Sequence, residues 1–428
     1  MILSVRYILI FVTLLIGFSN CKKSGGTPAG GGTKPAADTF IYKGADPSWI
    51  TQMETSGIKF YNASGQATDG LALLQSLGIN SIRLRAWVDP VAGWCNTADI
   101  VAKAVRARKL GMRVMIDIHY SDTWADPGHQ FPPAAWASYD LPTLTNAVST
   151  YTQGLLDTLK IAGVVPSWVQ LGNETNDGML WPLGRASTNM ANFAALINAG
   201  YKAVKAVSDT TQVIVHISNG YDNSLFRWMF DGLKANNAQY DIIGMSLYPT
   251  ADNWSAYNQS CAVNMNDMVT RYNKPVMVVE VGMPADEATT CEAFITDLIH
   301  KVRAVTGNKG LGVFYWEPEC YNNWQGYGLG AFDNTGKPTV AMNAFLPWRA
   351  GGPLAEGQSL NTQDENTTLW DLAYTVFCLR PTPPILRRRL EIPPWRRGRS
   401  LKRFQLSHGF RFHQIRPGRR HRHRPRLR

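Results

Sequence analysis

Short apolar runs alternate with longer amphipathic stretches through most of the chain, from about residue 38 to residue 345. The amphipathic stretches show helical periodicity, for example over residues 97–110, 144–161 and 190–207. The eight apolar runs have the length of strands and cover residues 40–44, 81–87, 113–119, 168–172, 213–217, 242–247, 276–281 and 312–315. Apolar strands that alternate with helices indicate a parallel sheet buried on both faces. Eight such units predict an α/β fold with a single (β/α)8 TIM barrel.

A doubly wound open sheet is the alternative architecture. To bind a nucleotide it would need a glycine-rich, phosphate-binding turn after its first strand, and no such turn follows residues 40–44. No proline-rich or glycine-rich break interrupts the alternating pattern. We therefore expect residues 39–347 to form one barrel domain.

The N-terminal 20 residues have the features of a secretory signal peptide. Arg6 precedes an apolar run over residues 7–18, which is shorter than the roughly 20 residues of a membrane-spanning helix. Cys21 comes directly after this segment and resembles the lipidated cysteine of a bacterial lipoprotein. Residues 21–38 would then form the lipoprotein anchor and a flexible linker rich in Gly, Pro, Ala and Thr. Ordinary signal cleavage, with an incidental cysteine, is the alternative; both interpretations predict export.

The net charge of +11 comes from the C-terminal end of the chain. Residues 380–428 hold 17 Lys or Arg and one acidic residue, whereas residues 1–379 hold 26 basic and 31 acidic residues. Strand and helix periodicity is poor over residues 348–428, so we expect a basic, disordered tail or translation in a shifted frame. A nucleic-acid-binding arm is the alternative, but few aromatic residues lie between the basic ones.

The remaining cysteines show no metal-ligand spacing such as CxxC. Because an exported chain can oxidise its thiols, we expect a disulfide among Cys261, Cys291 and Cys320.

Two carboxyl groups follow apolar runs where catalytic groups of a barrel would lie. Glu174 follows the fourth run and Glu280 lies near the end of the seventh. A buried carboxylate is costly unless it is paired or used, and a single glutamate at a strand end is more often structural. Two of them flanking one bond are what glycosidic hydrolysis requires. The aromatic side chains at other strand ends that could stack on sugar rings are Trp124, Trp181, Tyr248 and Trp316.

Two basic side chains on the second strand raise a question that the pattern leaves open. Arg83 and Arg85 are two residues apart, so they share one face of the strand and lie at different depths in a barrel. Either could reach the mouth. His119, at the end of the third strand, is equally well interpreted as structural or functional.

A series of motifs resembles glycoside hydrolase family 53, the arabinogalactan endo-β-1,4-galactanases. Its most specific member is DIHYSDTWAD at residues 117–126, followed by Pro127 and Gln130. The other matches, in chain order, are KGAD at 43–46, IRLRAWVDP at 82–90, GNE at 172–174, LWP at 180–182 with Gly184, IGMSLYP at 243–249, VE at 279–280 and FYWEP at 314–318. The resemblance covers roughly residues 40–346.

This resemblance implies a retaining enzyme with Glu174 as acid/base and Glu280 as nucleophile. It implies that Asn173 hydrogen-bonds the sugar 2-hydroxyl, that Tyr248 orients Glu280 and that Trp316 forms the subsite floor. The arginine of the family maps to Arg83, with Arg85 as the second choice. Asp117, His119, Trp124 and Asp126 fall in the motif that lines the sugar-binding cleft.

The expected substrate is the β-1,4-galactan of pectin side chains, hydrolysed by a monomer without a cofactor or a nucleic-acid partner. Two departures from the family pattern matter. Leu247 stands where relatives often have a tyrosine, and the short segment 282–291 has only two acidic residues, so we expect no calcium there. The alternatives are a related enzyme acting on mannan or cellulose, and a carbohydrate-binding lipoprotein without activity.

Overall fold

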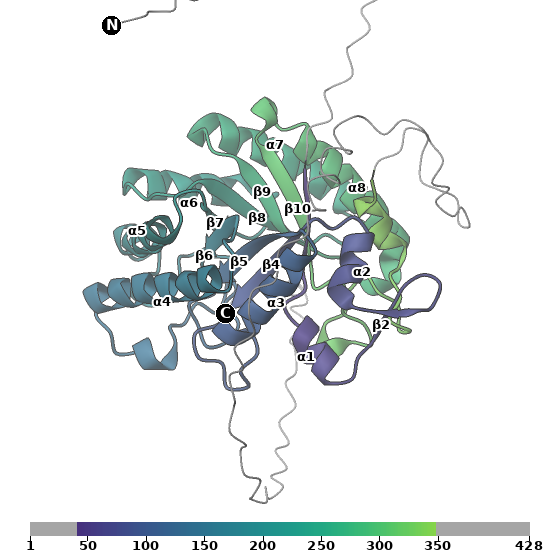
Figure 1. The fold of residues 1–428 in the computed structure, drawn as a ribbon. Helices are drawn as coiled ribbons and strands as arrows, with labels where there is room; N and C mark the ends of the chain where they lie inside the picture. Colours follow the sequence, from purple (N-terminus) through teal and green to yellow (C-terminus); the bar gives the residue numbers. More distant parts are fainter. Residues whose placement is uncertain (1–40, 348–428) are drawn as a thin grey trace, which may run out of the picture. The chain divides into compact units, whose positions relative to one another are not determined.

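The computed structural model of the protein describes residues 41–347, and within them eight parallel strands close into a barrel (Figure 1). The strand order around the barrel is β1-β10-β9-β8-β7-β6-β5-β4. The strands are β1 (Tyr42–Asp46), β4 (Ser81–Ala86), β5 (Arg113–Ile118), β6 (Trp168–Leu171), β7 (Gln212–Ile217), β8 (Ile242–Leu247), β9 (Val276–Val281) and β10 (Gly310–Trp316). Helices lie between successive strands and surround the barrel, which confirms the predicted (β/α)8 fold.

The helices around the barrel include all three that the periodicity predicts. They are α1 (Ile50–Thr55), α2 (Gly70–Ser76), α3 (Thr97–Lys109), α4 (Leu141–Ile161), α5 (Met190–Val207), α6 (Asn223–Ala235), α7 (Trp254–Tyr272) and α8 (Ala288–Arg303). Short 3-10 helices are η1 (Ala134–Trp136), η2 (Ala285–Glu287), η3 (Thr306–Asn308), η4 (Trp324–Gly326) and η5 (Val340–Phe345). A small antiparallel hairpin, β2 (Phe60–Tyr61) with β3 (Ala67–Thr68), was not predicted, because two-residue strands leave no periodicity in the sequence.

Polar residues at the helix starts explain where several of these helices begin. Asp69, Asn96, Asp140, Asn189 and Asp222 each accept a hydrogen bond from the backbone N–H three residues later. Such side chains satisfy one of the N–H groups that the first helical turn leaves without a partner. These caps therefore fix where the five helices begin.

Two layers of apolar side chains support the barrel. One lies between the strands and the helices, and a smaller one fills the barrel interior with Met115, Trp168, Ile214, Ile242, Met277, Val279 and Phe314. Gly44 makes room for this interior layer, because a Cβ there would lie 2.0 Å from Cδ1 of Phe314. The interior layer leaves the carboxyl ends of the strands to polar side chains.

The four cysteines that the structure describes are free and buried, so the predicted disulfide is wrong. Cys261 Sγ lies 3.6 Å from Sδ of Met245, and Cys320 Sγ lies 3.9 Å from Sδ of Met53. Cys291 Sγ lies 3.6 Å from the hydroxyl of Tyr315. These three thiols therefore pack against different parts of the core. Each behaves there as a buried apolar group and not as one half of a disulfide.

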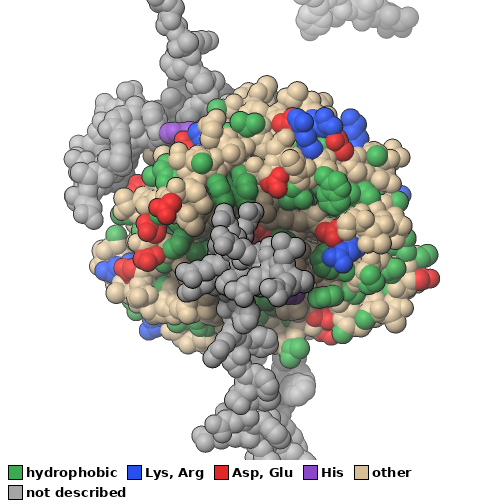
Figure 2. Space-filling view, turned by 180° about the vertical axis from the view of Figure 1, so that it is seen from behind, with side chains coloured by type: hydrophobic (Ala, Val, Ile, Leu, Met, Phe, Trp, Pro, Cys, Tyr) green, Lys and Arg blue, Asp and Glu red, His purple; other side chains and the backbone are tan. Residues whose placement is uncertain are grey.

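The surface of the described barrel carries charges of both signs. Figure 2 shows acidic and basic side chains interspersed among hydrophobic and polar ones on one face. Several are paired, such as Arg271 with Asp231 at 2.6 Å and Arg106 with Glu54 at 2.8 Å. None of the helices within residues 41–347 is long and apolar enough to cross a membrane.

The predicted signal peptide (1–20), the anchor and linker (21–38, with Cys21) and the basic tail (348–428) lie outside the described residues. Those three interpretations stay predictions.

Candidate active site

Glu280 reaches the barrel interior through an irregularity in β9. Met277 and Val279 both belong to the interior layer, so regular alternation would turn Glu280 outward. The pairing of β8 with β9 shifts register here, because Met245 lies opposite Val278 while the next residue, Ser246, lies opposite Glu280. This bulge inserts one residue and re-aims the carboxyl group into the mouth of the barrel.

Arg83 is the centre of the charged network at this end of the barrel. Its guanidinium contacts Glu280 Oε1 at 2.7 Å, Asp117 Oδ2 at 2.9 Å and Asp46 Oδ2 at 2.7 Å. Arg83 is fully buried, so these contacts form away from water. The question that the sequence left open has a geometric answer: Arg83, and not Arg85, contacts Glu280.

Glu280 has a second hydrogen-bond donor in Tyr248, whose hydroxyl lies 3.0 Å from Glu280 Oε2. Burial raises the pKa of the Glu280 carboxyl, while the Arg83 guanidinium lowers it and the charge of Glu174 raises it. Burial also raises the pKa of the Tyr248 phenol well above its ordinary value, so this hydroxyl stays protonated and donates to Glu280.

Glu174 follows β6 in a left-handed backbone conformation, with φ of 44°. Its backbone N–H donates to Nδ1 of His216 at 3.3 Å. Burial raises the pKa of the Glu174 carboxyl to about 7, against the opposing effects of the Ser246 hydroxyl and of Arg83. No cation is paired with Glu174 among the ion pairs of residues 41–347, in contrast to Glu280.

His216 lies beneath Glu174 as a neutral imidazole. Burial and the nearby Arg83 lower the pKa of His216 well below its ordinary value. Nδ1 of His216 lies 3.3 Å from the Glu174 N–H and 3.1 Å from Asn173 Oδ1, and Nε2 lies 2.6 Å from Ser246 Oγ. The Ser246 hydroxyl in turn hydrogen-bonds the Glu174 carboxyl group.

Asn173 is fixed on both sides of its amide group. Its Oδ1 accepts from Nη2 of Arg83 at 2.9 Å, and its Nδ2 donates to the backbone oxygen of Ala125 at 2.8 Å. Gln170 Nε2 also donates to Asn173 Oδ1, at 3.2 Å, and it donates to Asp117. Gln170 was missed by the sequence reasoning, although a polar residue inside the apolar run 168–172 was a usable signal.

His119 links Asp117 to the loop that carries Trp124. Its Nδ1 accepts from the Trp87 indole at 3.3 Å and from the Ala125 N–H at 3.0 Å, so Nε2 donates to Asp117 Oδ2 at 2.9 Å. Burial lowers the pKa of His119, which makes it neutral. The side chain therefore has a positioning role that the sequence alone left undecided.

The predicted aromatic residues fall into two places. Trp124, 37% exposed, lies 5.8 Å from Trp316 between ring centroids. Trp181 lies in the loop after β6, where its indole donates to the Asp177 oxygen at 2.8 Å and Arg185 lies 4.2 Å above its ring. The exposed Phe131, 6.4 Å from Trp181, was missed.

Asp126 stays within its own loop, although its charge helps to raise the pKa of Glu174. Its carboxylate contacts His129 Nδ1 at 2.9 Å and accepts from the Gly128 N–H at 2.7 Å.

Taken together, these contacts form one hydrogen-bonded network, with Glu174 beside it. Its members are Arg83, Asp117, His119, Asn173, Tyr248 and Glu280.

A closed (β/α)8 barrel with two carboxyl groups that influence each other at the ends of its fourth and seventh strands fits a glycoside hydrolase. The sequence profile of "Glycosyl hydrolase family 53" matches residues 42–345, and the chain belongs to this family.

Curated relatives extend this comparison. A probable arabinogalactan endo-β-1,4-galactanase A of Neosartorya fischeri is 35% identical over 336 residues, 73% of this chain and 91% of the relative. The arabinogalactan endo-β-1,4-galactanase of Thermothelomyces thermophilus is 33% identical over 321 residues, 69% of this chain and 94% of the relative.

Two solved structures share the fold over nearly their whole length. One comes from a study of two fungal β-1,4-galactanases and has a TM-score of 0.66 at 31% identity, covering 71% of this chain and 98% of that one. The other, a catalytic domain of the same family from Ignisphaera aggregans, has a TM-score of 0.66 at 28% identity, covering 73% and 97%.

Proposed function

We propose that this chain is a retaining endo-β-1,4-galactanase, which hydrolyses internal β-1,4-galactosidic bonds in the arabinogalactan side chains of pectin. Membership of the family supports the reaction class, and the two galactanase relatives support the substrate. The observation that carries the mechanism is Glu280, held between the Arg83 guanidinium and the Tyr248 hydroxyl.

The two carboxyl groups take different roles because their neighbours differ. Arg83 and Tyr248 both stabilise the ionised form of Glu280, which suits a nucleophile. Glu174 has no paired cation among the ion pairs of the described residues, and burial raises its pKa, so it can hold a proton near neutral pH. When both groups compete for one proton, the Arg83 guanidinium favours the ionised form of Glu280, which supports a proton on Glu174.

The reaction then proceeds by double displacement. A carboxylate oxygen of Glu280 bonds to the anomeric carbon while the glycosidic bond breaks, and Glu174 gives its proton to the departing oxygen. In the second step Glu174 takes a proton from water. The water oxygen then bonds to the anomeric carbon, and the bond to Glu280 breaks. Both carboxyl groups return to their starting states, so the steps need no cofactor.

The surrounding side chains position the sugar. Asn173 uses one N–H on the Ala125 oxygen, and its second N–H suits the sugar 2-hydroxyl. Trp316 forms the floor of the cleaved subsite, and Trp124 and Trp181 stack on neighbouring sugar rings. Asp117 and His119 hold Arg83 and the Trp124 loop, and Asp126 shapes that loop.

We also propose that the enzyme is exported and works as a monomer. The signal-like segment 1–20 supports export, and Cys21 would carry a lipid that attaches the enzyme to the cell envelope.

The test is release of reducing sugar from galactan, mannan, cellulose and xylan by the wild-type chain, Glu280→Gln and the control Glu292→Gln on α8. We expect release from galactan only, loss in Glu280→Gln and retention in Glu292→Gln. Activity on another glycan would contradict the proposed substrate, and full activity of Glu280→Gln would contradict the proposed mechanism. Binding of galactan without release would favour a carbohydrate-binding lipoprotein.

A further inference from the structure

Arg85 is a buried cation that the proposed mechanism does not use. It is 1% exposed, and its Nη1 contacts Glu317 Oε1 at 3.1 Å. Its Nε and Nη2 have no hydrogen-bond partner among the described residues, and the buried Cys95 thiol is its other polar neighbour. A buried guanidinium with a single ion pair needs other stabilisation, because burial away from water is costly.

Four tryptophans supply that stabilisation, and we name them the tryptophan cluster: Trp49, Trp87, Trp124 and Trp316. The guanidinium carbon of Arg85 lies 4.1 Å from the ring centroid of Trp124, 5.0 Å from Trp87, 5.3 Å from Trp49 and 6.0 Å from Trp316. These distances lie within the range of cation–π attraction. The four rings come from different parts of the chain, so one cation holds them together.

The cluster connects the buried arginine with the sugar-facing surface. Trp49 lies 5.5 Å from both Trp124 and Trp316, and Trp124 is 37% exposed. Trp124 therefore rests on Arg85 and still offers part of its surface to solvent. A tilt of the guanidinium would tilt the aromatic surface that meets the substrate.

Glu317 holds the Arg85 guanidinium through an ion pair. Its Oε1 contacts Arg85, and its Oε2 accepts from the backbone N–H of Trp49 at 3.1 Å. The same carboxylate thus holds the cation and the segment that carries one of the four rings.

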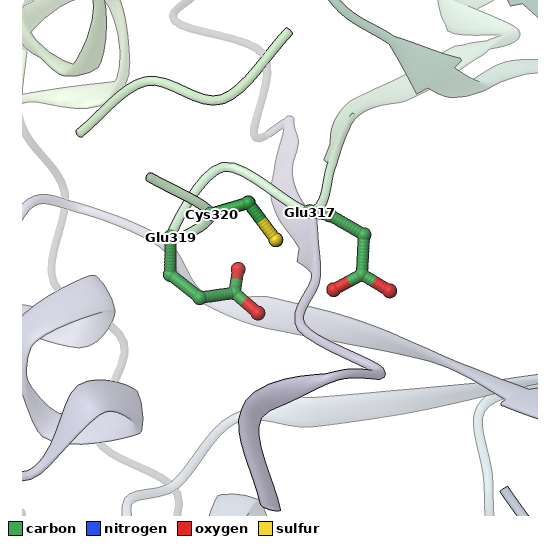
Figure 3. A group of neighbouring side chains, drawn as sticks. All are labelled: Glu317, Glu319 and Cys320. Atoms are coloured by element: carbon green, nitrogen blue, oxygen red, sulfur yellow. The ribbon is translucent and has the colours of Figure 1, made fainter. Parts of the chain in front are cut away.

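Glu319 completes this arrangement. Figure 3 shows the carboxyl group of Glu319 directed toward one carboxyl oxygen of Glu317, with the sulfur of Cys320 beside them. One ligand atom of each residue lies within 4.8 Å of the others, and both Glu319 oxygens lack a hydrogen-bond donor among the described residues. Two fully buried carboxylates facing one arginine would leave an uncompensated negative charge.

A proton on Glu319 removes this excess charge and supplies the missing bond. Burial and the charge of Glu317 raise the pKa of Glu319 well above its ordinary value. The protonated carboxyl then donates to Glu317, which keeps its charge for Arg85. Both oxygens of Glu317 are already engaged by donors, so a shared proton satisfies this group better than a metal ion would.

We propose that Arg85, held by Glu317 and a protonated Glu319, is a positioning residue that sets the orientation of Trp124 and Trp316 for sugar binding. The inference rests on the proposed galactanase function. Arg85 touches neither Glu174 nor Glu280 in the described contacts, so it acts on substrate affinity through the tryptophan cluster.

The test compares Arg85→Met with Arg85→Lys in galactan hydrolysis. Methionine keeps much of the side-chain volume and removes the charge, so we expect KM to rise about tenfold with kcat changed less than about twofold. Lysine restores a cation beneath the rings and should recover most of this loss. The matched control is Arg113→Met, which removes a cation 5.3 Å from the Tyr42 ring at the opposite end of the barrel.

Galactotetraose binding to Glu280→Gln, with and without Arg85→Met, gives the same comparison without turnover. Unchanged KM and unchanged binding in folded Arg85→Met would overturn the inference, as would equal effects of Arg113→Met. Galactan hydrolysis by the wild-type chain is measured alongside. If it is absent, the proposed function fails instead.

The protonation of Glu319 has its own test. Glu319→Gln places an amide N–H where the acid proton would lie, so its KM should stay near the wild-type value. Glu319→Leu cannot donate, and its KM should rise toward that of Arg85→Met. If Glu319→Gln impairs binding as much as Glu319→Leu, the shared proton is wrong.

Discussion

At the scale of single residues, the two candidate catalytic carboxyl groups differ in what surrounds them. Glu280 has a cation at 2.7 Å and a phenol at 3.0 Å, whereas the half-buried Glu174 accepts a hydrogen bond from the Ser246 hydroxyl. In the proposed mechanism the same residue type therefore serves as nucleophile at one place and as proton donor at the other. The neutral His216 completes the division, because it orders the Ser246 hydroxyl without adding charge.

This difference predicts the alkaline limb of the pH–rate profile. Glu174 must be protonated to act as the acid, so kcat/KM should fall as the pH rises through about 7, the pKa of Glu174. Glu174→Gln should lose this limb, which a pH series on galactan would measure. On an aryl galactobioside, whose phenolate leaves without protonation, azide should restore turnover of Glu174→Ala with the β-galactosyl azide as product, whereas Glu280→Ala should yield the α-galactosyl azide. An alkaline limb that persists in Glu174→Gln would contradict the assignment.

Tyr248→Phe tests the hydrogen bond to the nucleophile. Removing one preorganised donor of this kind costs on the order of 10²-fold in rate, and we expect a loss of that size in kcat/KM. Because the charged form of Glu280 loses a hydrogen-bond donor, the pKa of Glu280 should rise. The acid limb of the pH–rate profile, which reports the deprotonation of Glu280, should then move to higher pH. Tyr272→Phe, whose hydroxyl contacts surface Asp231 at 2.9 Å, is the control. An unmoved acid limb would show that Tyr248 does not support the charge of Glu280.

At the scale of elements, the strand pattern could be predicted and the bulge in β9 could not. The runs 242–247 and 276–281 coincide with β8 and β9, because strands buried on both faces are continuously apolar. The run 40–44 begins two residues before β1, whose last residue is Asp46, buried against Arg83. The ion pair with Arg83 allows the charged Asp46 to lie buried at the end of β1. A hydrophobicity pattern cannot reveal that such a residue belongs to the strand.

The candidate site was predictable where residue type and position sufficed. Glu174, Glu280 and Asn173 stand out as polar groups after apolar runs. The direction of Glu280 depends on a register shift, and the choice between Arg83 and Arg85 depends on depth in the barrel. Both are three-dimensional properties that spacing alone leaves undetermined. The predicted disulfide failed for the same reason, since it assumed proximity among thiols that pack in separate places.

Gly44→Ala tests how the barrel interior is filled. The new Cβ would lie 2.0 Å from Phe314, so the interior layer must shift, and overpacking of this kind costs about 1–3 kcal/mol in the free energy of unfolding. Gly154→Ala on α4 is the opposite control, because its Cβ meets nothing within 4 Å and alanine favours a helix. Denaturant unfolding should show Gly44→Ala destabilised and Gly154→Ala slightly stabilised. Equal stabilities would show that Phe314 repacks without cost.

At the scale of the whole molecule, the first and the last segments of the described residues meet and close the barrel. β1 pairs with both β10 and β4, and Lys43 Nζ donates to the backbone oxygens of Phe345 at 2.9 Å and Leu346 at 2.7 Å. These contacts reach Leu346, one residue past the family match, so they lie before the predicted basic tail, residues 348–428.

A chain ending at residue 347 should therefore keep the enzyme's activity. Every side chain of the proposed site lies within the family match, and we expect kcat/KM on galactan within about twofold of the full chain. The truncation removes the excess of positive charge, so any retention of the full chain on DNA should be salt-dependent and should disappear. The measurement is galactan hydrolysis and DNA retention of both chains at two salt concentrations. A large loss of hydrolysis would give residues 348–428 a part in the enzyme, because neither the site nor the closed barrel provides another reason for it.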